Sequence, residues 1–147
     1  MFGKPKKPQG NNQGPAYQML DIIVNTLNEK NLKYTIDDER PVIRLNFRGD
    51  NIESQTFTLI VDEDGESVAL RVFSIYQFEK GQLADAYEFC NRVNNQYRWM
   101  RFYVDSDDEL TAAIDAVVSP DTAGEECYEL VGRAVDIVDS VYGEMIS

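Results

Sequence analysis

Apolar residues near the start of the chain follow the spacing of an amphipathic helix. From Tyr17 onward they recur three and four positions apart, at Leu20, Ile23, Val24 and Leu27. This spacing places them on one face of a helix with about 3.6 residues per turn. Asparagines follow directly and favour a helix end. The pattern therefore predicts a helix over residues 16–30.

After this helix the pattern changes to alternation, which is typical of strands. Residues 32–36 form a short candidate strand, and Pro41 opens the next one. In that second segment one face carries Ile43, Leu45 and Phe47, and the other face carries Arg44, Asn46 and Arg48. Such alternation predicts a strand with one buried face and one polar face.

Two longer apolar segments follow, at residues 54–61 and 67–76. The acidic stretch 62–66 joins them, and its Asp-Gly pair favours a tight hairpin turn. Both segments are apolar on both faces in places, as expected of central strands. We expect helices to cover one face and a further partner, such as another subunit, to cover the second.

The second half of the chain repeats the alternation of helix and strands. A helix is predicted over residues 81–96, a strand over 99–104, a turn over 105–109 and a returning strand over 110–118. Ser119-Pro120-Asp121 then precedes a last helix that reaches about residue 145. The order is α-β-β-β(-β)-α-β-β-α. Hairpin connections dominate, so we predict the α+β class, with a mainly antiparallel sheet and helices packed on it.

Composition divides the chain into two unequal parts. Residues 1–15 are rich in Gly, Pro, Asn and Gln and carry Lys4, Lys6 and Lys7, which predicts a flexible basic tail. Residues 16–147 have the length of one domain, so a single α+β domain is expected there. The chain shows neither a secretory signal nor an apolar run of about 18 residues, which favours a cytoplasmic protein without a membrane span.

Charge is unevenly distributed over a chain whose formal net charge is −12. Residues 105–147 carry Arg133 alone against twelve acids. Because affinity for nucleic acid depends on Lys and Arg, so acidic a body disfavours nucleic-acid partners, and it disfavours anionic membranes for the same reason. Basic or amphipathic protein segments are the partners that this surface favours, although acidity also serves solubility alone.

The sequence offers little for catalysis. It contains no histidine, which removes the commonest general base and the commonest zinc ligand. Cys90 and Cys127 fall on the apolar sides of predicted helices and are expected in the core. Glycine patterns typical of phosphate loops are missing, and the acidic turns 62–66 and 105–109 do not follow the calcium-loop pattern. We therefore expect no cofactor, no metal and no enzymatic activity.

Aromatic residues near strand ends are the candidate binding residues. They are Tyr76, Phe78, Tyr97, Trp99 and Tyr103. Aromatic side chains are enriched at the centres of protein interfaces. Two explanations remain open at this point, because the same residues could simply complete the core beneath the helices.

Short motifs in the second half resemble the YbjN-like family of bacterial proteins, which are described as sensory transduction regulators. The matching positions are Asn91, Asn94, Phe102, Asp105, Asp139 and Tyr142, and the resemblance spans residues 16–146. It implies a fold similar to that of type III secretion chaperones, which are small acidic dimers. It supplies no catalytic residue. The asparagines are also suited to cap the end of the second helix, because Asn tolerates the left-handed conformation.

Three functional hypotheses follow from these observations. The first is a non-enzymatic, homodimeric, protein-binding or regulatory domain of the YbjN-like kind. The second is a secretion-type chaperone that holds a segment of a client protein. The third, from another class, is a small-ligand receptor or an enzyme that uses a cleft beneath the helices.

Overall fold

The computed structural model describes residues 14–147, and residues 1–13 of the predicted basic tail lie outside them. Helix α1 (Pro15–Glu29) begins with a proline in its first turn, where a missing N–H does not weaken the helix. Pro15 therefore belongs to the helix and not to the tail. The helix ends as the asparagines predict, and Asn31 adopts a left-handed φ of 60°.

Six antiparallel strands form one sheet in the order β1-β2-β3-β4-β6-β5. Their bounds are β1 Thr35–Ile36, β2 Val42–Phe47, β3 Gln55–Val61, β4 Ser67–Gln77, β5 Arg101–Val104 and β6 Glu109–Val117. The predicted α+β class and the order of elements are confirmed. The first strand is shorter than the predicted 32–36, because the Leu32 amide donates to Leu27 O and so extends the end of α1.

One face of the sheet is the buried face. Leu59 on β3 pairs with Leu70 on β4, which pairs with Ile114 on β6, and each of these side chains is at most 5% exposed. Side chains alternate between the two faces of a strand, so the intervening residues point the other way. The alternation of apolar and polar residues in the sequence predicts this division correctly.

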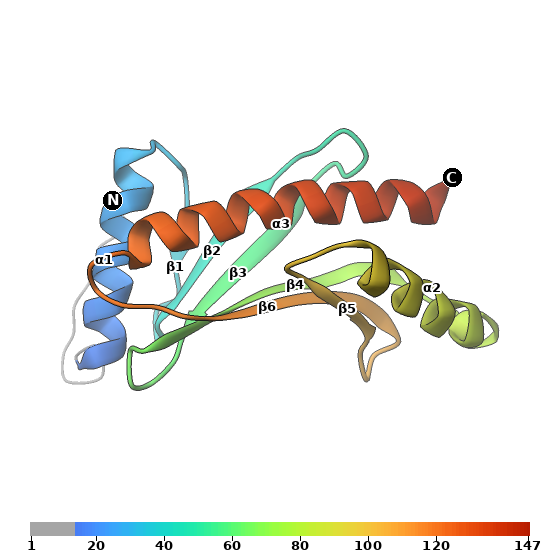
Figure 1. Ribbon diagram of the computed structural model, residues 1–147, viewed down its shortest axis with the longest axis horizontal. Helices are drawn as coiled ribbons and strands as arrows, with labels where there is room; N and C mark the ends of the chain where they lie inside the picture. The colour runs from blue at the N-terminus through green and yellow to red at the C-terminus, as the bar shows by residue number, and fades with distance from the viewer. Residues whose placement is uncertain (1–13) are drawn as a thin grey trace.

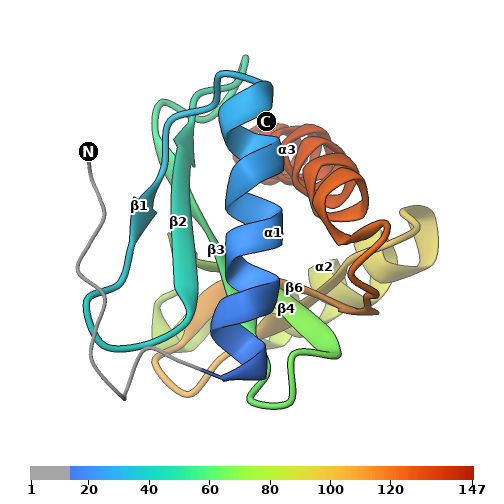
Figure 2. The same cartoon turned by 90° about the vertical axis from the view of Figure 1, so that its left-hand side faces the viewer.

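The helices lie on the buried side of the sheet (Figures 1 and 2). The long helix α3 (Ala123–Ile146) crosses the sheet, and α1 packs beside its first half. Helix α2 (Leu83–Gln96) follows a short 3₁₀ turn η2 (Lys80–Gln82) and packs against β5. None of the helices described between residues 14 and 147 has the length and apolar character needed to cross a membrane.

A carboxylate on α3 holds the loop between β2 and β3. The backbone amides of Asp50, Asn51 and Ile52 donate to the Asp139 carboxylate at 2.8–3.1 Å. Gly49 leaves room for this contact, because a Cβ there would lie 2.3 Å from Asp139 Oδ1. The loop is thereby fixed against the second half of α3.

Candidate protein-interaction surface

The sheet face opposite the helices carries a regular row of side chains. The strand register aligns one residue from each strand, and the row runs Thr35, Arg44, Thr58, Arg71, Ala113 and Arg101. Arginines thus alternate with small residues across the whole sheet. Neighbouring strands lie about 4.8 Å apart, so successive arginines stand roughly 10 Å from one another at their backbones. We call these six residues the arginine row.

Aspartates pair with the arginines of this row. Arg44 contacts Asp37 at 3.0 Å, and Asp115 contacts both Arg71, at 2.9 Å, and Arg101, at 3.1 Å. The hydrogen bond from Arg71 is the main reason why the pKa of Asp115 lies below its usual value, and Arg101 adds to this effect. Both aspartates, whose pKa values are lowered, are charged at neutral pH and offset two of the three positive charges of the row.

Asp37 holds the side chain of Arg44 in place near one end of the arginine row. Burial alone would raise the pKa of its carboxyl group, but hydrogen bonds from the Glu39 amide, Arg44 and Arg40 outweigh burial and lower the pKa to about 2. The carboxylate also accepts the Arg40 amide at 3.0 Å. These contacts fix the position of the Arg44 guanidinium on the sheet surface.

Exposed apolar side chains border the arginine row. Phe73 is 47% exposed, Tyr103 is 37% exposed and Val117 is 85% exposed. A hollow of about 390 Å³ lies next to Val117, between the ends of β3, β4 and β6, and Ile60 and Ala69 form part of its lining. Exposed apolar groups mark surfaces that contact other proteins, and arginine and aromatic residues are enriched at such interfaces.

The structure separates the five predicted aromatic residues. Tyr103 lies beside the arginine row. Phe78 is 7% exposed, and its ring packs at a tilt against the partly buried Tyr76, with 5.1 Å between the ring centroids. The Tyr97 hydroxyl donates to Glu144 at 2.6 Å and so ties α2 to α3. Trp99 is 49% exposed and lies on the other side of the molecule, against α3.

Trp99 occupies a special backbone position. It has a left-handed φ of 79° in the loop between α2 and β5. Its ring lies 5.1 Å from the guanidinium of Arg98 and 4.7 Å from that of Arg133. Arg133 in turn pairs with Glu129 one helical turn earlier. This cluster belongs to the helical side and not to the arginine row.

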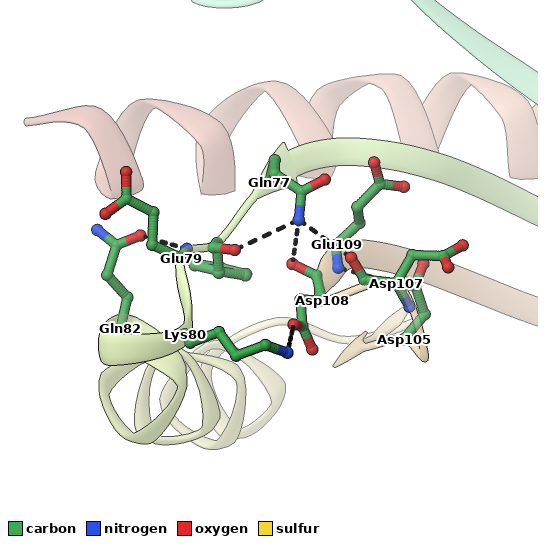
Figure 3. A network of polar contacts seen from close by, with 9 residues as sticks. Gln77, Glu79, Lys80, Gln82, Asp105, Asp107, Asp108 and Glu109 are labelled. Atoms are coloured by element: carbon green, nitrogen blue, oxygen red, sulfur yellow. Dashed lines mark hydrogen bonds and ion pairs between the residues drawn. The ribbon is translucent and has the colours of Figure 1, made fainter.

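The acidic turn between β5 and β6 is braced by hydrogen bonds (Figure 3). Gln77 Nε2 donates to Asp107 O and Asp108 O, and Lys80 pairs with Asp108 at 3.0 Å. The Asp105 carboxylate accepts the amides of Asp107 and Glu109. These bonds hold the turn against the end of β4.

Asp105, Asp107 and Glu109 place carboxylate oxygens within 4.8 Å of one another, which is compact enough to hold a cation. Two of the three groups already have partners. Asp105 also accepts the Thr111 hydroxyl at 2.7 Å, and Glu109 accepts the Ser74 hydroxyl at 2.7 Å. Hydrogen bonds that stabilise the turn therefore explain why these carboxylates lie close together.

Asn94, one of the motif residues, hydrogen-bonds to the outer side of β5, which is an edge strand of the sheet. Its side chain accepts the Phe102 amide at 2.7 Å and donates to Phe102 O at 3.0 Å. It thus satisfies backbone groups that would otherwise template another strand. The predicted capping role is wrong, because Asn94 lies inside α2, and Trp99 is the left-handed residue of this segment.

The two cysteines lie in the core, as predicted. Cys90 and Cys127 are both free and buried. Burial raises the pKa of both thiols and, with Glu126 nearby, that of Cys127 to about 12. Because the thiolate is the reactive form, neither group is poised for nucleophilic chemistry.

Sequence reasoning missed the arginine row and the contacts of Asp139. The alternation at Arg44 and Arg71 was visible in the sequence, but their alignment depends on the register of strands distant in the chain. Asp139 stands on a predicted helix, where its partners 87–89 residues away give no local signal.

Comparison with known proteins identifies a family and structures with a similar fold. A family model described as YbjN, putative bacterial sensory transduction regulator, matches residues 19–147. The chain is also similar to the crystal structure of YbjN, a putative transcription regulator from E. coli, with a TM-score of 0.61 and 7% identity. The alignment covers 86% of this chain and 92% of that chain, and at this identity it concerns the fold. The search of curated proteins finds no match.

Proposed function

This chain belongs to the YbjN family, and we propose that it is a non-enzymatic regulatory domain that acts by binding protein. The arginine row and its apolar border are the proposed contact surface, and a second copy of the chain is its proposed occupant. The observation that carries this proposal is the sheet face without covering helices, on which Phe73, Tyr103 and Val117 remain exposed.

Charge supports a second copy as the occupant. With a net charge of −12, two copies repel each other over most of their surface. The arginine row is different, because its three arginines face only Asp37 and Asp115 in ion pairs. In a two-fold contact the aspartates beside one arginine row can pair with arginines of the partner's row, and the same contacts occur twice.

The available chemistry supports a role without catalysis. The chain has no histidine, and both thiols are buried with raised pKa values. Shifted carboxyl groups such as Asp105, Asp115 and Asp139 have lowered pKa values, which suits structural hydrogen bonds and ion pairs better than proton transfer near neutral pH.

The direct test is the mass of the full chain in solution by light scattering. The expected result is about twice the chain mass of 16.8 kDa. Tyr103→Lys places a charge inside the contact and should give the single-chain mass. Tyr87→Lys is the matched control, since Tyr87 is 58% exposed on α2 and lies outside the arginine row. A wild-type protein that stays at the single-chain mass at tens of micromolar contradicts the dimer.

The secretion-chaperone hypothesis predicts a different particle. Protein purified from its own host would then carry one further polypeptide at fixed stoichiometry. The receptor or enzyme hypothesis predicts that a metabolite raises the melting temperature, because a ligand that binds only the folded state stabilises it. Mass and melting temperature together therefore separate the three hypotheses.

A further inference from the structure

A second surface lies on the helical side of the molecule, away from the arginine row. A groove of about 690 Å³ runs along α3, and Leu32 and Phe47 form the wall opposite the helix. The α3 wall is a single stripe of residues three and four positions apart. The stripe consists of Glu125, Tyr128, Glu129, Gly132, Val135 and Asp136, and Val131 and Arg133 beside it complete the α3 lining.

Gly132 stands at the middle of this stripe and has no packing reason to be glycine. An added Cβ there would meet no atom of the described residues within 4 Å. The other glycines of α3 are in tight contact, since a Cβ at Gly124 would lie 1.9 Å from Thr26 Oγ1 and one at Gly143 would lie 2.6 Å from Asn51 Nδ2. A glycine inside a helix weakens the helix relative to alanine. The monomer therefore gains nothing from Gly132, whereas a partner gains close access to the helix backbone.

The groove combines an apolar floor with an acidic rim. Val131 is 2% exposed, Phe47 is partly buried, and Tyr128 remains 37% exposed. Three acids of α3, Glu125, Glu129 and Asp136, line the groove together with Arg133, the helix's one base. Lys30 pairs with Glu125 at 3.5 Å and lies over the ring of Tyr128. Arg133 is already engaged by Glu129 and by the ring of Trp99.

We infer that this groove receives an amphipathic helix of another protein, with an apolar stripe toward Phe47 and Val131 and basic residues toward Glu129 and Asp136. A helix fits because it can lie along α3 and approach most closely at the bare backbone of Gly132. Basic side chains fit because the rim is acidic.

Two other occupants of the groove fit less well: a second copy of the chain, and the lysine-bearing segment before Gly14. If a second copy docked here by two-fold symmetry about Gly132, position 129 of one chain would face position 135 of the other, which brings Glu129 close to the neighbouring Asp136, and like charges repel. The lysine-bearing segment before Gly14 contains Pro5 and Pro8, which the interior of a helix excludes. The inference rests on the proposed protein-binding role but not on the dimer.

The test uses the full chain and a synthetic peptide. The probe is a tryptophan-free helical peptide of about 18 residues, with Leu on one stripe and Lys on the remainder. Trp99 is the sole tryptophan of the chain and contacts Arg133 at the groove, so its fluorescence reports binding. A peptide of identical composition in scrambled order controls for attraction by charge alone.

Two variants and their controls locate the binding site. Gly132→Leu places a side chain in the groove, where its Cβ meets no described atom within 4 Å, and should weaken the peptide at least about tenfold with an unchanged or higher melting temperature. Gly81→Leu is its control, because an added Cβ there also meets no described atom and Gly81 lies in η2. Asp136→Lys should weaken binding too, whereas Glu88→Lys, on the exposed side of α2, makes the same change in charge and should not.

Three results overturn the inference. They are equal binding by Gly132→Leu and wild type, equal binding of the scrambled peptide, and no binding at millimolar peptide. The mass of the protein is measured in the same samples. Wild-type protein that is a dimer but does not bind the peptide refutes the groove alone, while wild-type protein that binds the peptide as a monomer refutes the dimer alone.

Discussion

The two ends of helix α3 and its middle differ in how closely other parts of the chain approach their glycines. At Gly124 and Gly143 another part of the chain comes so close that a Cβ would overlap it, at 1.9 Å from Thr26 and 2.6 Å from Asn51. At Gly132 no described atom lies within 4 Å of the same position. Of the three, Gly132 lies deepest in the helix interior, where glycine is unfavourable relative to alanine. Close packing within the fold therefore explains Gly124 and Gly143. It does not explain Gly132, which is why we assign Gly132 to contact with another molecule.

The largest expected effect is that two alanine substitutions change the free energy of unfolding in opposite directions. Gly124→Ala forces α1 and α3 apart near Thr26 and should cost about 1–3 kcal/mol. Gly132→Ala should raise stability by up to about 1 kcal/mol, because alanine favours the helix and nothing is displaced. Urea denaturation of both variants measures the two changes. Equal effects of the two substitutions would remove the basis for treating Gly132 as a binding position.

The next effect tests the contact that holds the second half of α3. Asp139→Ala leaves the amides of Asp50, Asn51 and Ile52 without their carboxylate and should cost about 2 kcal/mol. Asp136→Ala is the matched control on the groove side of the same helix, and its change should stay within about 0.5 kcal/mol. Urea denaturation again gives both values. A similar loss of unfolding free energy in the two variants would mean that the hydrogen bonds of Asp139 do not stabilise the fold beyond an ordinary surface contact.

A smaller effect is expected at the edge of the sheet. Asn94→Ala removes two hydrogen bonds to Phe102 and should cost about 1 kcal/mol. It also frees the outer edge of β5, so faster aggregation at high concentration is expected. Asn95→Ala, one position along and exposed, is the control for both readouts, which are denaturation and light scattering.

Local patterns explain why most of the fold could be predicted. The spacing of Leu20, Ile23 and Leu27 already specifies the buried face of α1, since these side chains are at most 3% exposed in the structure. The alternation at Ile43 and Leu45 does the same for β2. Such periodicities depend only on residues a few positions apart, which the sequence displays directly.

The surfaces could not be predicted in the same way, because they depend on which segments meet. Arg44 and Arg71 belong to one row only because Thr58 stands between them in the sheet register. Phe78 and Trp99 have similar sequence surroundings, yet the first is 7% exposed and the second 49%. Gly132 becomes informative only once the empty space beside it is known.

The smallest expected effect concerns pH and again compares two positions of α3. Burial alone would raise the pKa of Asp139, but the amides of Asn51, Ile52 and Asp50 outweigh burial and lower it. A carboxyl group with a lowered pKa in the folded state stabilises the fold fully above its unfolded pKa, about 3.9, and loses this contribution as the pH falls through its folded pKa. The difference in unfolding free energy between wild type and Asp139→Asn should therefore be constant from pH 7 to about pH 5 and shrink below about pH 4. Asp136→Asn makes the same change in net charge at the groove and is the control in the same series of urea denaturations. A parallel decline in both variants would assign the effect to overall charge instead of to the Asp139 contacts.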